Sequence, residues 1–183
     1  MICLKCGRSF DSGLPTTITP ALKDKVMDGS LFLLKCPQCG APCLAEGPLV
    51  YHDPEAKILV VFSETTLNAS QTPEGYTCRR VEDVGSLIEK VKIFDAGLDD
   101  VAIEICKFVT RKELGKEVEL KFLKMDGSDG ELTLAYPGGG QMEMVCVGAN
   151  VYSDALAIIS RNPSLEAIGL EKVDATYISS RLE

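Results

Sequence analysis

Two closely spaced pairs of cysteines are the residues of this chain with the clearest chemical potential. The pairs read Cys3-Leu4-Lys5-Cys6-Gly7 and Cys36-Pro37-Gln38-Cys39-Gly40. A two-residue spacer lets a tight turn direct both sulfurs at one point, and the following glycine can adopt the positive φ that turns backbone N–H groups toward thiolates. Four thiolates suit tetrahedral Zn²⁺ and leave no position for water. The spacing therefore predicts a structural zinc site with the ligands Cys3, Cys6, Cys36 and Cys39.

Other interpretations of the cysteine pairs stay open. Iron or an iron–sulfur cluster can occupy the same four-sulfur cage. A thiol redox switch, in which oxidation releases the metal, is a further alternative. A single redox dithiol is disfavoured, because such motifs follow a strand in a βαβ unit and no strand precedes Cys3.

The other cysteines and the single histidine are interpreted as structural residues. Cys43 is a spare thiol beside four better-spaced ones. We expect Cys78, Cys106 and Cys146 to be buried, because a free cysteine behaves as a small hydrophobic residue. His52 precedes Asp53-Pro54, which is typical of a turn. No catalytic residue is predicted, and without another histidine many hydrolase mechanisms are excluded.

The elements that position the cysteines must accommodate a long spacer. The 29 residues between Cys6 and Cys36 exceed the roughly 15–20 that are common in such sites, which predicts an insertion. Thr19, Pro20 and Gly29 have the types favoured at the start and end of a helix, so residues 20–28 are predicted to be helical and to pack beside the metal site. Residues 31–34 are a predicted strand that leads to the second pair.

The rest of the chain predicts an α+β fold. An antiparallel hairpin is expected at 48–62, and a loop at 63–76 separates a zinc-ribbon-like module (1–65) from an α+β domain (77–183). That domain is expected to contain helices at 84–91 and 98–109, a three-stranded antiparallel meander at 118–146 with turns at 126–130 and 137–140, and helices at 153–160 and 174–182. The charges of the 98–109 helix are interpreted as a solvated face, with the acidic residues near its start favoured by the helix dipole.

Composition and charge narrow the classes of function. The chain has 183 residues, is 45% hydrophobic and carries a net charge of −8, of which residues 1–50 contribute +1 and the remainder −9. No apolar run is long enough for a membrane helix, and the first residues lack a run of signal-peptide length, so we expect a cytoplasmic protein without a membrane partner. The acidic balance disfavours nucleic-acid binding.

Several of these residues resemble the CpXC domain family. The resemblance rests on Cys-Pro-Gln-Cys at 36–39, the partner pair at Cys3 and Cys6, Leu-Val-Tyr-His-Asp-Pro at 49–54 and the run from Arg80 to Lys90, and it is best over residues 1–109. The first pair lacks the family's proline, which stiffens the turn but supplies no ligand. The resemblance implies a metal site. It implies no biological role, because the function of the family is uncharacterised.

Three classes of function follow from this sequence. The first is a protein-binding or adaptor module with a protein partner or self-association, for which an exposed apolar patch would be the discriminating observation. The second is a zinc-ribbon nucleic-acid-binding regulator that uses Arg8, Lys23, Lys25 and Lys35 as a local basic surface. The third is an enzyme, which would require a pocket with convergent polar groups.

Overall fold

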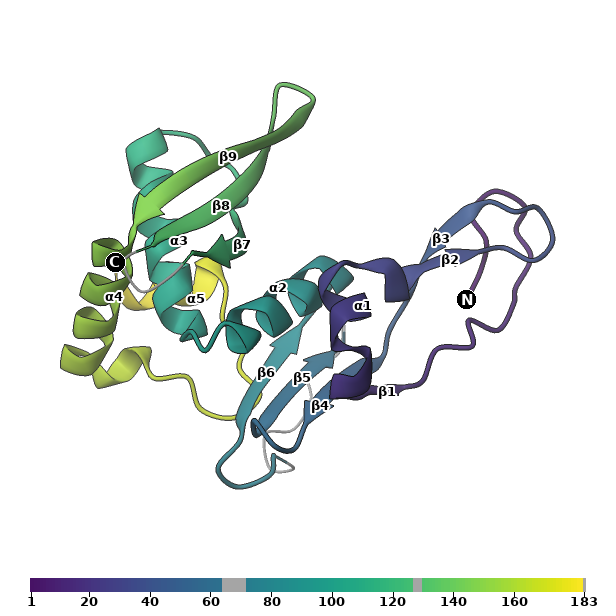
Figure 1. Cartoon of the computed structure of the whole chain (residues 1–183), viewed down its shortest axis with the longest axis horizontal. Coiled ribbons are helices and arrows are strands. Elements are labelled where there is room, and N and C mark those ends of the chain that lie inside the picture. The colour runs from purple at the N-terminus through teal and green to yellow at the C-terminus, as the bar shows by residue number, and fades with distance from the viewer. Residues whose placement is uncertain (64–71, 127–129, 183) are drawn as a thin grey trace. The chain divides into compact units, whose positions relative to one another are not determined.

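The computed structural model describes residues 1–63, 72–126 and 130–182. The chain forms two compact units, Met1–Val91 and Lys92–Glu183, which we describe separately (Figure 1). Helices and several separate sheets confirm the predicted α+β class. The predicted division into a module at 1–65 and a domain at 77–183 stays a prediction. Most of the predicted loop at 63–76 and of the predicted turn at 126–130 lies outside the described residues.

The first unit contains a four-stranded mixed sheet. Its strands, in the order β1-β4-β5-β6, are β1 (Thr17–Ile18), β4 (Leu49–Asp53), β5 (Ile58–Phe62) and β6 (Thr77–Val81). β4 and β5 form the predicted antiparallel hairpin, in which Asp53 Oδ1 accepts hydrogen bonds from the backbone N–H groups of Glu55 (3.1 Å) and Ala56 (2.9 Å). This Asx turn shows why an aspartate ends β4.

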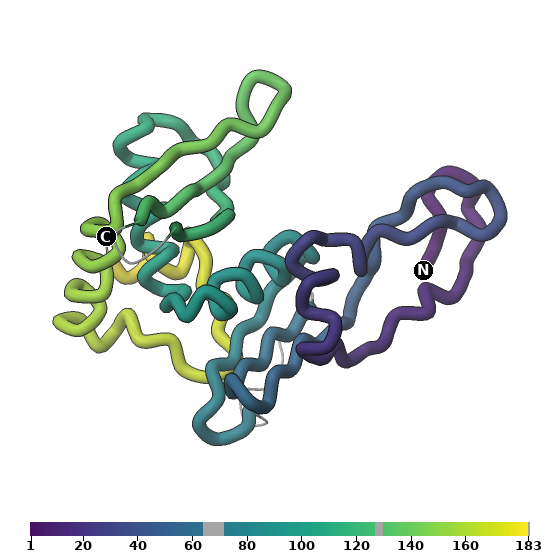
Figure 2. The backbone as a smooth tube through the Cα atoms, in the orientation of Figure 1, coloured from purple at the N-terminus to yellow at the C-terminus, as the bar shows by residue number. Residues whose placement is uncertain are grey.

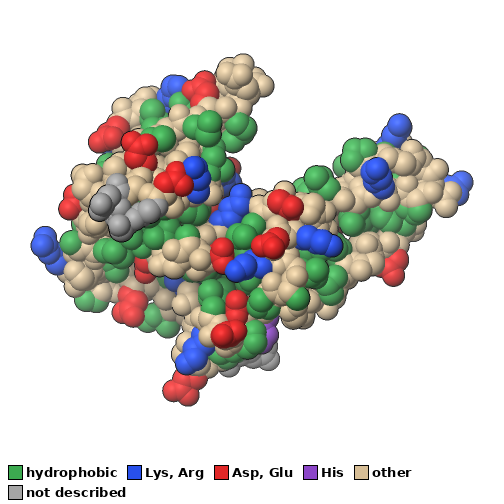
Figure 3. Space-filling view, viewed as in Figure 1, with side chains coloured by type: hydrophobic (Ala, Val, Ile, Leu, Met, Phe, Trp, Pro, Cys, Tyr) green, Lys and Arg blue, Asp and Glu red, His purple; other side chains and the backbone are tan. Residues whose placement is uncertain are grey.

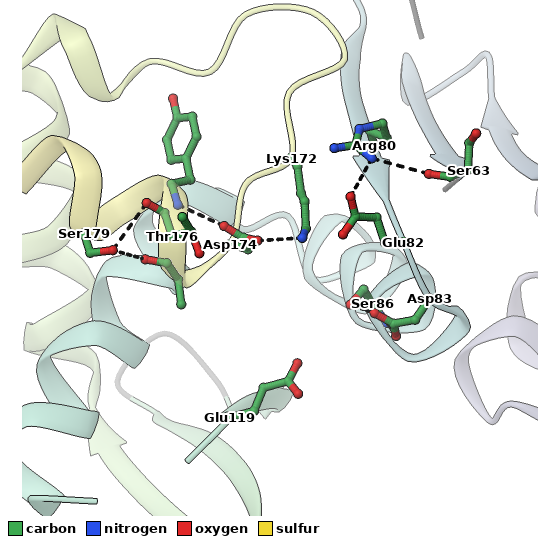
Figure 4. A network of polar contacts seen from close by, with 12 residues as sticks. Ser63, Arg80, Glu82, Asp83, Ser86, Glu119, Lys172, Asp174, Thr176 and Ser179 are labelled. Carbon is green, nitrogen blue, oxygen red and sulfur yellow. Dashed lines mark hydrogen bonds and ion pairs between the residues drawn. The ribbon is translucent and has the colours of Figure 1, made fainter. Parts of the chain in front are cut away.

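The parallel strand β6 was not predicted, because its sequence carries adjacent arginines in place of an apolar alternation. Val81 and Cys78 are buried in it, and Arg79 is buried as well. Arg80 Nη1 donates to Glu82 Oε1 at 2.7 Å and to the backbone carbonyl of Ser63 at 3.4 Å (Figure 4). The Arg80 guanidinium thus forms hydrogen bonds with groups beside the strand, while the backbone of β6 pairs with β5 as the last strand of the sheet.

The spacer between the cysteine pairs is helical as predicted but is divided into short pieces. These are the 3₁₀ turn η1 (Pro20–Leu22), the helix α1 (Lys23–Met27) and the 3₁₀ turn η2 (Ser30–Phe32). Pro20 takes the first helical position, and Gly29 has a φ of 78°, which glycine adopts without steric cost. The predicted strand at 31–34 begins later than expected, since β2 (Leu33–Lys35) follows η2 and pairs with β3 (Pro42–Leu44).

The second unit packs helices on the predicted three-stranded antiparallel sheet. The sheet order is β7-β8-β9, with β7 (Lys121–Met125), β8 (Glu131–Gly138) and β9 (Gln141–Gly148). The helices are α3 (Asp100–Leu114), α4 (Ala149–Arg161) and α5 (Ala175–Leu182), with the 3₁₀ turn η4 (Pro163–Leu165) between the last two. Their shared core includes Ile103, Phe122, Leu132, Leu134 and Ile178.

Aspartates fix the starts of three helices. Asp83 accepts from the backbone N–H of Ser86 at the start of α2 (Val84–Asp95), at 2.7 Å. Asp99 accepts from Ala102 at 2.9 Å and caps α3, and Asp174 accepts from Tyr177 at 2.9 Å at the start of α5 (Figure 4). Each carboxylate satisfies an N–H that has no partner within its helix.

Two expectations about side-chain exposure are wrong. The charged residues of α3 were expected to form a solvated face, but three of them are buried: Asp100, Glu104 and Lys107. The Glu104 carboxylate and the Lys107 ammonium lie 2.7 Å apart, so their opposite charges compensate each other in the interior. Cys146 is exposed because it lies on the outward face of the edge strand β9, whereas Cys78 and Cys106 are buried as predicted.

Candidate metal centre

The two cysteine pairs adopt the same local backbone structure. In the first, the N–H of Gly7 donates to the carbonyl of Cys3 (2.8 Å); in the second, the N–H of Gly40 donates to the carbonyl of Cys36 (2.9 Å). Gly7 has a φ of 70° and Gly40 a φ of 69°, so both turns end in a left-handed glycine. Each pair is therefore a tight turn that presents two sulfurs from one side.

Short β-structures hold these turns. The N–H of Cys3 donates to the carbonyl of Arg8 (2.9 Å), and Ile2 forms an isolated antiparallel bridge with Ser9. The second turn closes the β2–β3 hairpin, where the N–H of Cys36 donates to the carbonyl of Ala41 (2.9 Å). The N-terminal segment runs alongside this hairpin within the first unit (Figure 2).

The structure brings Cys3, Cys6, Cys36 and Cys39 together. Their Sγ atoms all lie within 4.8 Å of one another, with 3.6 Å between Cys3 and Cys39 and 3.7 Å between Cys6 and Cys36. In a tetrahedron with metal–sulfur bonds of about 2.3 Å, the sulfurs are about 3.8 Å apart. The spacing of the thiols therefore matches a four-sulfur metal cage, and all eight cysteines are free thiols.

A small core supports the sulfurs on one side. Cys3, Cys36 and Ala41 are buried together, and Phe10 and Cys43 pack against them. Cys6 and Cys39 reach solvent. The prediction that the helical spacer packs beside the metal site is wrong, because Leu22 and Val26 are not part of this core. Instead, η1 lies against β4 of the four-stranded sheet.

The surroundings of the sulfurs separate their pKa values. The pKa of Cys3 is lowered to about 6, chiefly because the backbone N–H of Cys6 points at its sulfur. The pKa of Cys6 is raised to about 12: the backbone N–H of Arg8 favours its thiolate, but burial and the thiols of Cys3, Cys39 and Cys36 oppose ionisation. Several thiolates at this spacing repel one another, and a divalent cation among them would remove that repulsion.

Two contacts around the cluster were not anticipated from the sequence. Arg8 Nη1 donates to Gln38 Oε1 at 3.3 Å and so joins the two turns. Cys43 lies against the buried cysteines, and its Sγ–H donates to the carbonyl of Ala41 at 3.7 Å. Cys43 reaches this position from β3, where it is paired with Leu34 of β2.

The other candidate residues do not join a site. His52 lies in β4, one residue before the turn, and its ring is 5.7 Å from the ring of Tyr76. Within the residues that the structure describes, the cysteine cluster is the one group of three or more histidine, cysteine or acidic side chains close enough to hold a metal ion.

Comparisons with known proteins agree with this picture. A family model described as CpXC protein matches residues 1–107, more than half of the chain, which includes both cysteine pairs and the four-stranded sheet. No curated protein and no solved structure is significantly similar to the chain. Over the described part of the chain, no helix combines the length and apolar character needed to cross a membrane.

Proposed function

The chain belongs to the CpXC family, and from that premise we propose that Cys3, Cys6, Cys36 and Cys39 bind one Zn²⁺ as a structural centre. The observation that supports this most is the mutual approach of the four Sγ atoms to within 4.8 Å. Zinc is the metal that best suits a closed tetrahedral set of thiolates. Because no position stays open for water or substrate, the ion would stabilise the fold and would not act as a Lewis acid.

The metal would organise a part of the chain that has little else to hold it. The segments around both turns contribute a bridge, a hairpin of two three-residue strands, the Arg8–Gln38 hydrogen bond and a small core of Cys3, Cys36 and Ala41 with Phe10 and Cys43 against it. A metal ion bound by all four thiolates would add a cross-link between the two turns and so stabilise these segments. We propose the cytoplasm as its location, because a reducing compartment keeps the thiols available for the metal.

We propose protein binding as the role of the cysteine module. Leu4, between the first two cysteines, is 98% exposed, and Ile2 is exposed beside it in sequence. Leu33 and Leu44 are opposite each other in the β2–β3 hairpin, and both are exposed. Hydrophobic side chains are visible over the part of the molecule that carries β2 and β3 (Figure 3). Apolar side chains on so small a module are typical of a protein-binding surface.

Metal analysis of the purified chain, without a polyhistidine tag, tests the zinc centre. We expect about one zinc per chain, and we expect Cys3→Ser and Cys36→Ser each to abolish binding because three thiolates no longer close the site. Cys43→Ser is the matched control, since this thiol touches the same core but is not one of the four; it should retain the zinc.

Two other results would redirect the proposal. Iron in place of zinc would change the metal and keep the ligands. A chain that binds no metal, and in which Cys3–Cys6 or Cys36–Cys39 oxidises reversibly to a disulfide, would make a redox switch the better explanation. Steeply salt-dependent binding to DNA or RNA would favour the nucleic-acid alternative over a protein partner.

A further inference from the structure

The two edge strands of the sheet in the second unit, β7 and β9, differ in how well they are protected against pairing with a strand of another chain. β7 carries Lys121 and Lys124, and its pairing with β8 is interrupted between Phe122 and Lys124 by a register shift. Lysines and bulges are the means by which natural proteins prevent an edge strand from pairing with another chain. The β7 edge is therefore protected.

The β9 edge has none of these protections. All eight residues from Gln141 to Gly148 pair with β8 in one uninterrupted register. The strand contains no lysine, arginine or proline, and its one charged residue, Glu143, accepts a hydrogen bond from the hydroxyl of Tyr136 at 2.7 Å. Among the described residues, no strand pairs with the outer side of β9.

The hairpin geometry shows which backbone groups face that outer side. Gly138 and Gln141 are paired around a two-residue loop in which Gly139 (φ 57°) and Gly140 (φ 84°) are both left-handed, as in a type I′ turn. The pair that closes such a loop is hydrogen-bonded. Because hydrogen-bonded and non-hydrogen-bonded pairs alternate along an antiparallel ladder, the next pair, Pro137 with Met142, is non-hydrogen-bonded, which suits a proline without an N–H.

The same alternation places Met142, Met144 and Cys146 in non-hydrogen-bonded pairs, so their N–H and C=O groups point away from β8. Their side chains lie on the exposed face of the sheet, where Met142 is 59% and Met144 is 69% exposed. A row of free backbone donors and acceptors thus runs beside a row of uncharged side chains.

From this arrangement we propose that β9 pairs antiparallel with β9 of a second copy of the chain, which joins two three-stranded sheets into one of six strands about a two-fold axis. This self-association goes beyond the protein-binding role proposed for the segment that carries the cysteines, because β9 belongs to the second unit, and it does not depend on the metal. A strand can pair with its own copy because a two-fold axis presents the same donors and acceptors from both sides.

The side chains of β9 fit this occupant. With the axis at Val145, Met144 lies opposite Cys146 of the second copy, and Glu143 lies opposite Val147 of the second copy, so no like charges meet. A groove of about 270 Å³ lies between β9, α3 and α4, and its lining combines the apolar residues Leu114, Val145, Val147 and Val151 with Thr110 and Glu113. Val145 of the second copy would enter that groove beside its apolar residues, which gives the pairing a side-chain contact in addition to its backbone hydrogen bonds.

Sedimentation equilibrium at about 0.15 M salt, where surface charges are screened beyond about 8 Å, tests the proposal. We expect the chain of 19.8 kDa to sediment with twice that mass. The double variant Met144→Lys with Cys146→Lys, which gives β9 the protection that β7 has, should halve the mass. Leu123→Lys is the matched control on the exposed face of β7 and should remain dimeric.

A wild-type chain that is monomeric at all accessible concentrations would overturn the proposal, and so would a dimer that persists in the double variant, because the copies would then join elsewhere.

If the double variant does not fold, amide exchange of the wild type decides. The amides of Met142, Met144 and Cys146 should become about tenfold more protected as dilute protein is concentrated, and unchanged protection would contradict the pairing. Zinc content measured on the same samples separates this outcome from a failure of the metal centre.

Discussion

At the scale of the residue, position decides what each cysteine does. Four cysteines meet at one point because two turns of equal geometry face each other. Cys106 is buried in a helix, and burial raises the pKa of its thiol to about 12, which leaves it inert. Cys146 has the same chemical type but is exposed on an edge strand. A thiol therefore takes its role from the partners that the backbone gives it.

Glu143 is the residue for which we predict a pH effect. Its pKa is held below the ordinary 4.5, first by the hydrogen bond from the Tyr136 hydroxyl and then by the charge of Lys116, while burial opposes the shift. A lowered pKa in the folded state means that the stabilisation is present above about pH 4.5 and is lost as the pH falls through the lower folded value. Glu143→Gln should thus destabilise the second unit at pH 7, and this destabilisation should shrink as the pH falls below about 4.5.

Urea unfolding of the second unit at several pH values measures this difference. The matched control is Glu131→Gln, an exposed acid on the neighbouring strand β8, which should change the free energy of unfolding at neutral pH less than Glu143→Gln does. A Glu143→Gln effect of equal size at neutral and acidic pH would show that the carboxylate stabilises the hairpin through packing alone.

At the scale of the element, short polar signals fix where the helices start. The aspartates before α2, α3 and α5 each accept a hydrogen bond from the backbone N–H three residues later. α3 also ends at Gly115, whose φ of 61° and hydrogen bonds to the carbonyls of Arg111 and Lys112 close the helix. The longest helix of the described chain thus begins after an aspartate and ends before a glycine, two residue types that are common at these positions.

For α3 we predict that Asp99→Ala lowers the free energy of unfolding of the second unit by about 1 kcal/mol, because the N–H of Ala102 loses its acceptor. Asp99→Asn should retain most of the stability, since asparagine caps helices about as well as aspartate. Thermal unfolding of the two variants, followed by circular dichroism, measures the difference. Equal destabilisation by both substitutions would show that charge, and not the capping hydrogen bond, is what matters.

At the scale of the whole molecule, the chain is divided into two compact units, and the cysteines of the cluster lie in the first. The cysteine cluster and its small core belong entirely to Met1–Val91. The large core of the second unit includes helical and sheet residues and no member of the cluster. The energetic effect of a metal should accordingly concentrate in the first unit, because a ligand stabilises the structure that binds it.

Removal of the metal by a strong chelator should therefore reduce protection against amide exchange around Cys3, Cys36 and the β2–β3 hairpin, and leave β8 and α3 protected. Mass-spectrometric amide exchange of the full chain, with and without chelator, makes the comparison. Cys36→Ser is the control, since a chain that cannot bind the metal should not respond. An equal loss of protection in both units would show that the metal stabilises the whole chain.

The sequence by itself determined the features that depend on residue type over short distances. The paired spacing of the cysteines predicted the cluster, and alternation and turn residues predicted the hairpin at 48–62 and the β7–β8–β9 meander. Apolar residues at helical spacing predicted the helices at 84–91 and 98–109, and terminal residue types predicted the helical spacer at 20–28. The family resemblance is likewise carried by short motifs, and the family match over 1–107 confirmed it. In each case the physical cause lies within a few neighbouring residues.

Only the tertiary structure decided what depends on residues far apart in the chain. β6 was not predicted, because Arg79 and Arg80 interrupt the apolar alternation typical of a strand. The strand forms because its backbone pairs in parallel with β5, which is distant in sequence. The packing of the spacer on the sheet, the contact of Cys43 with the cluster and the burial of Glu104 against Lys107 also come from packing. The exposure of Cys146 followed from the face of β9 on which it lies, together with Met142 and Met144. Sheet order and burial are properties of the assembled chain, and local pattern does not contain them.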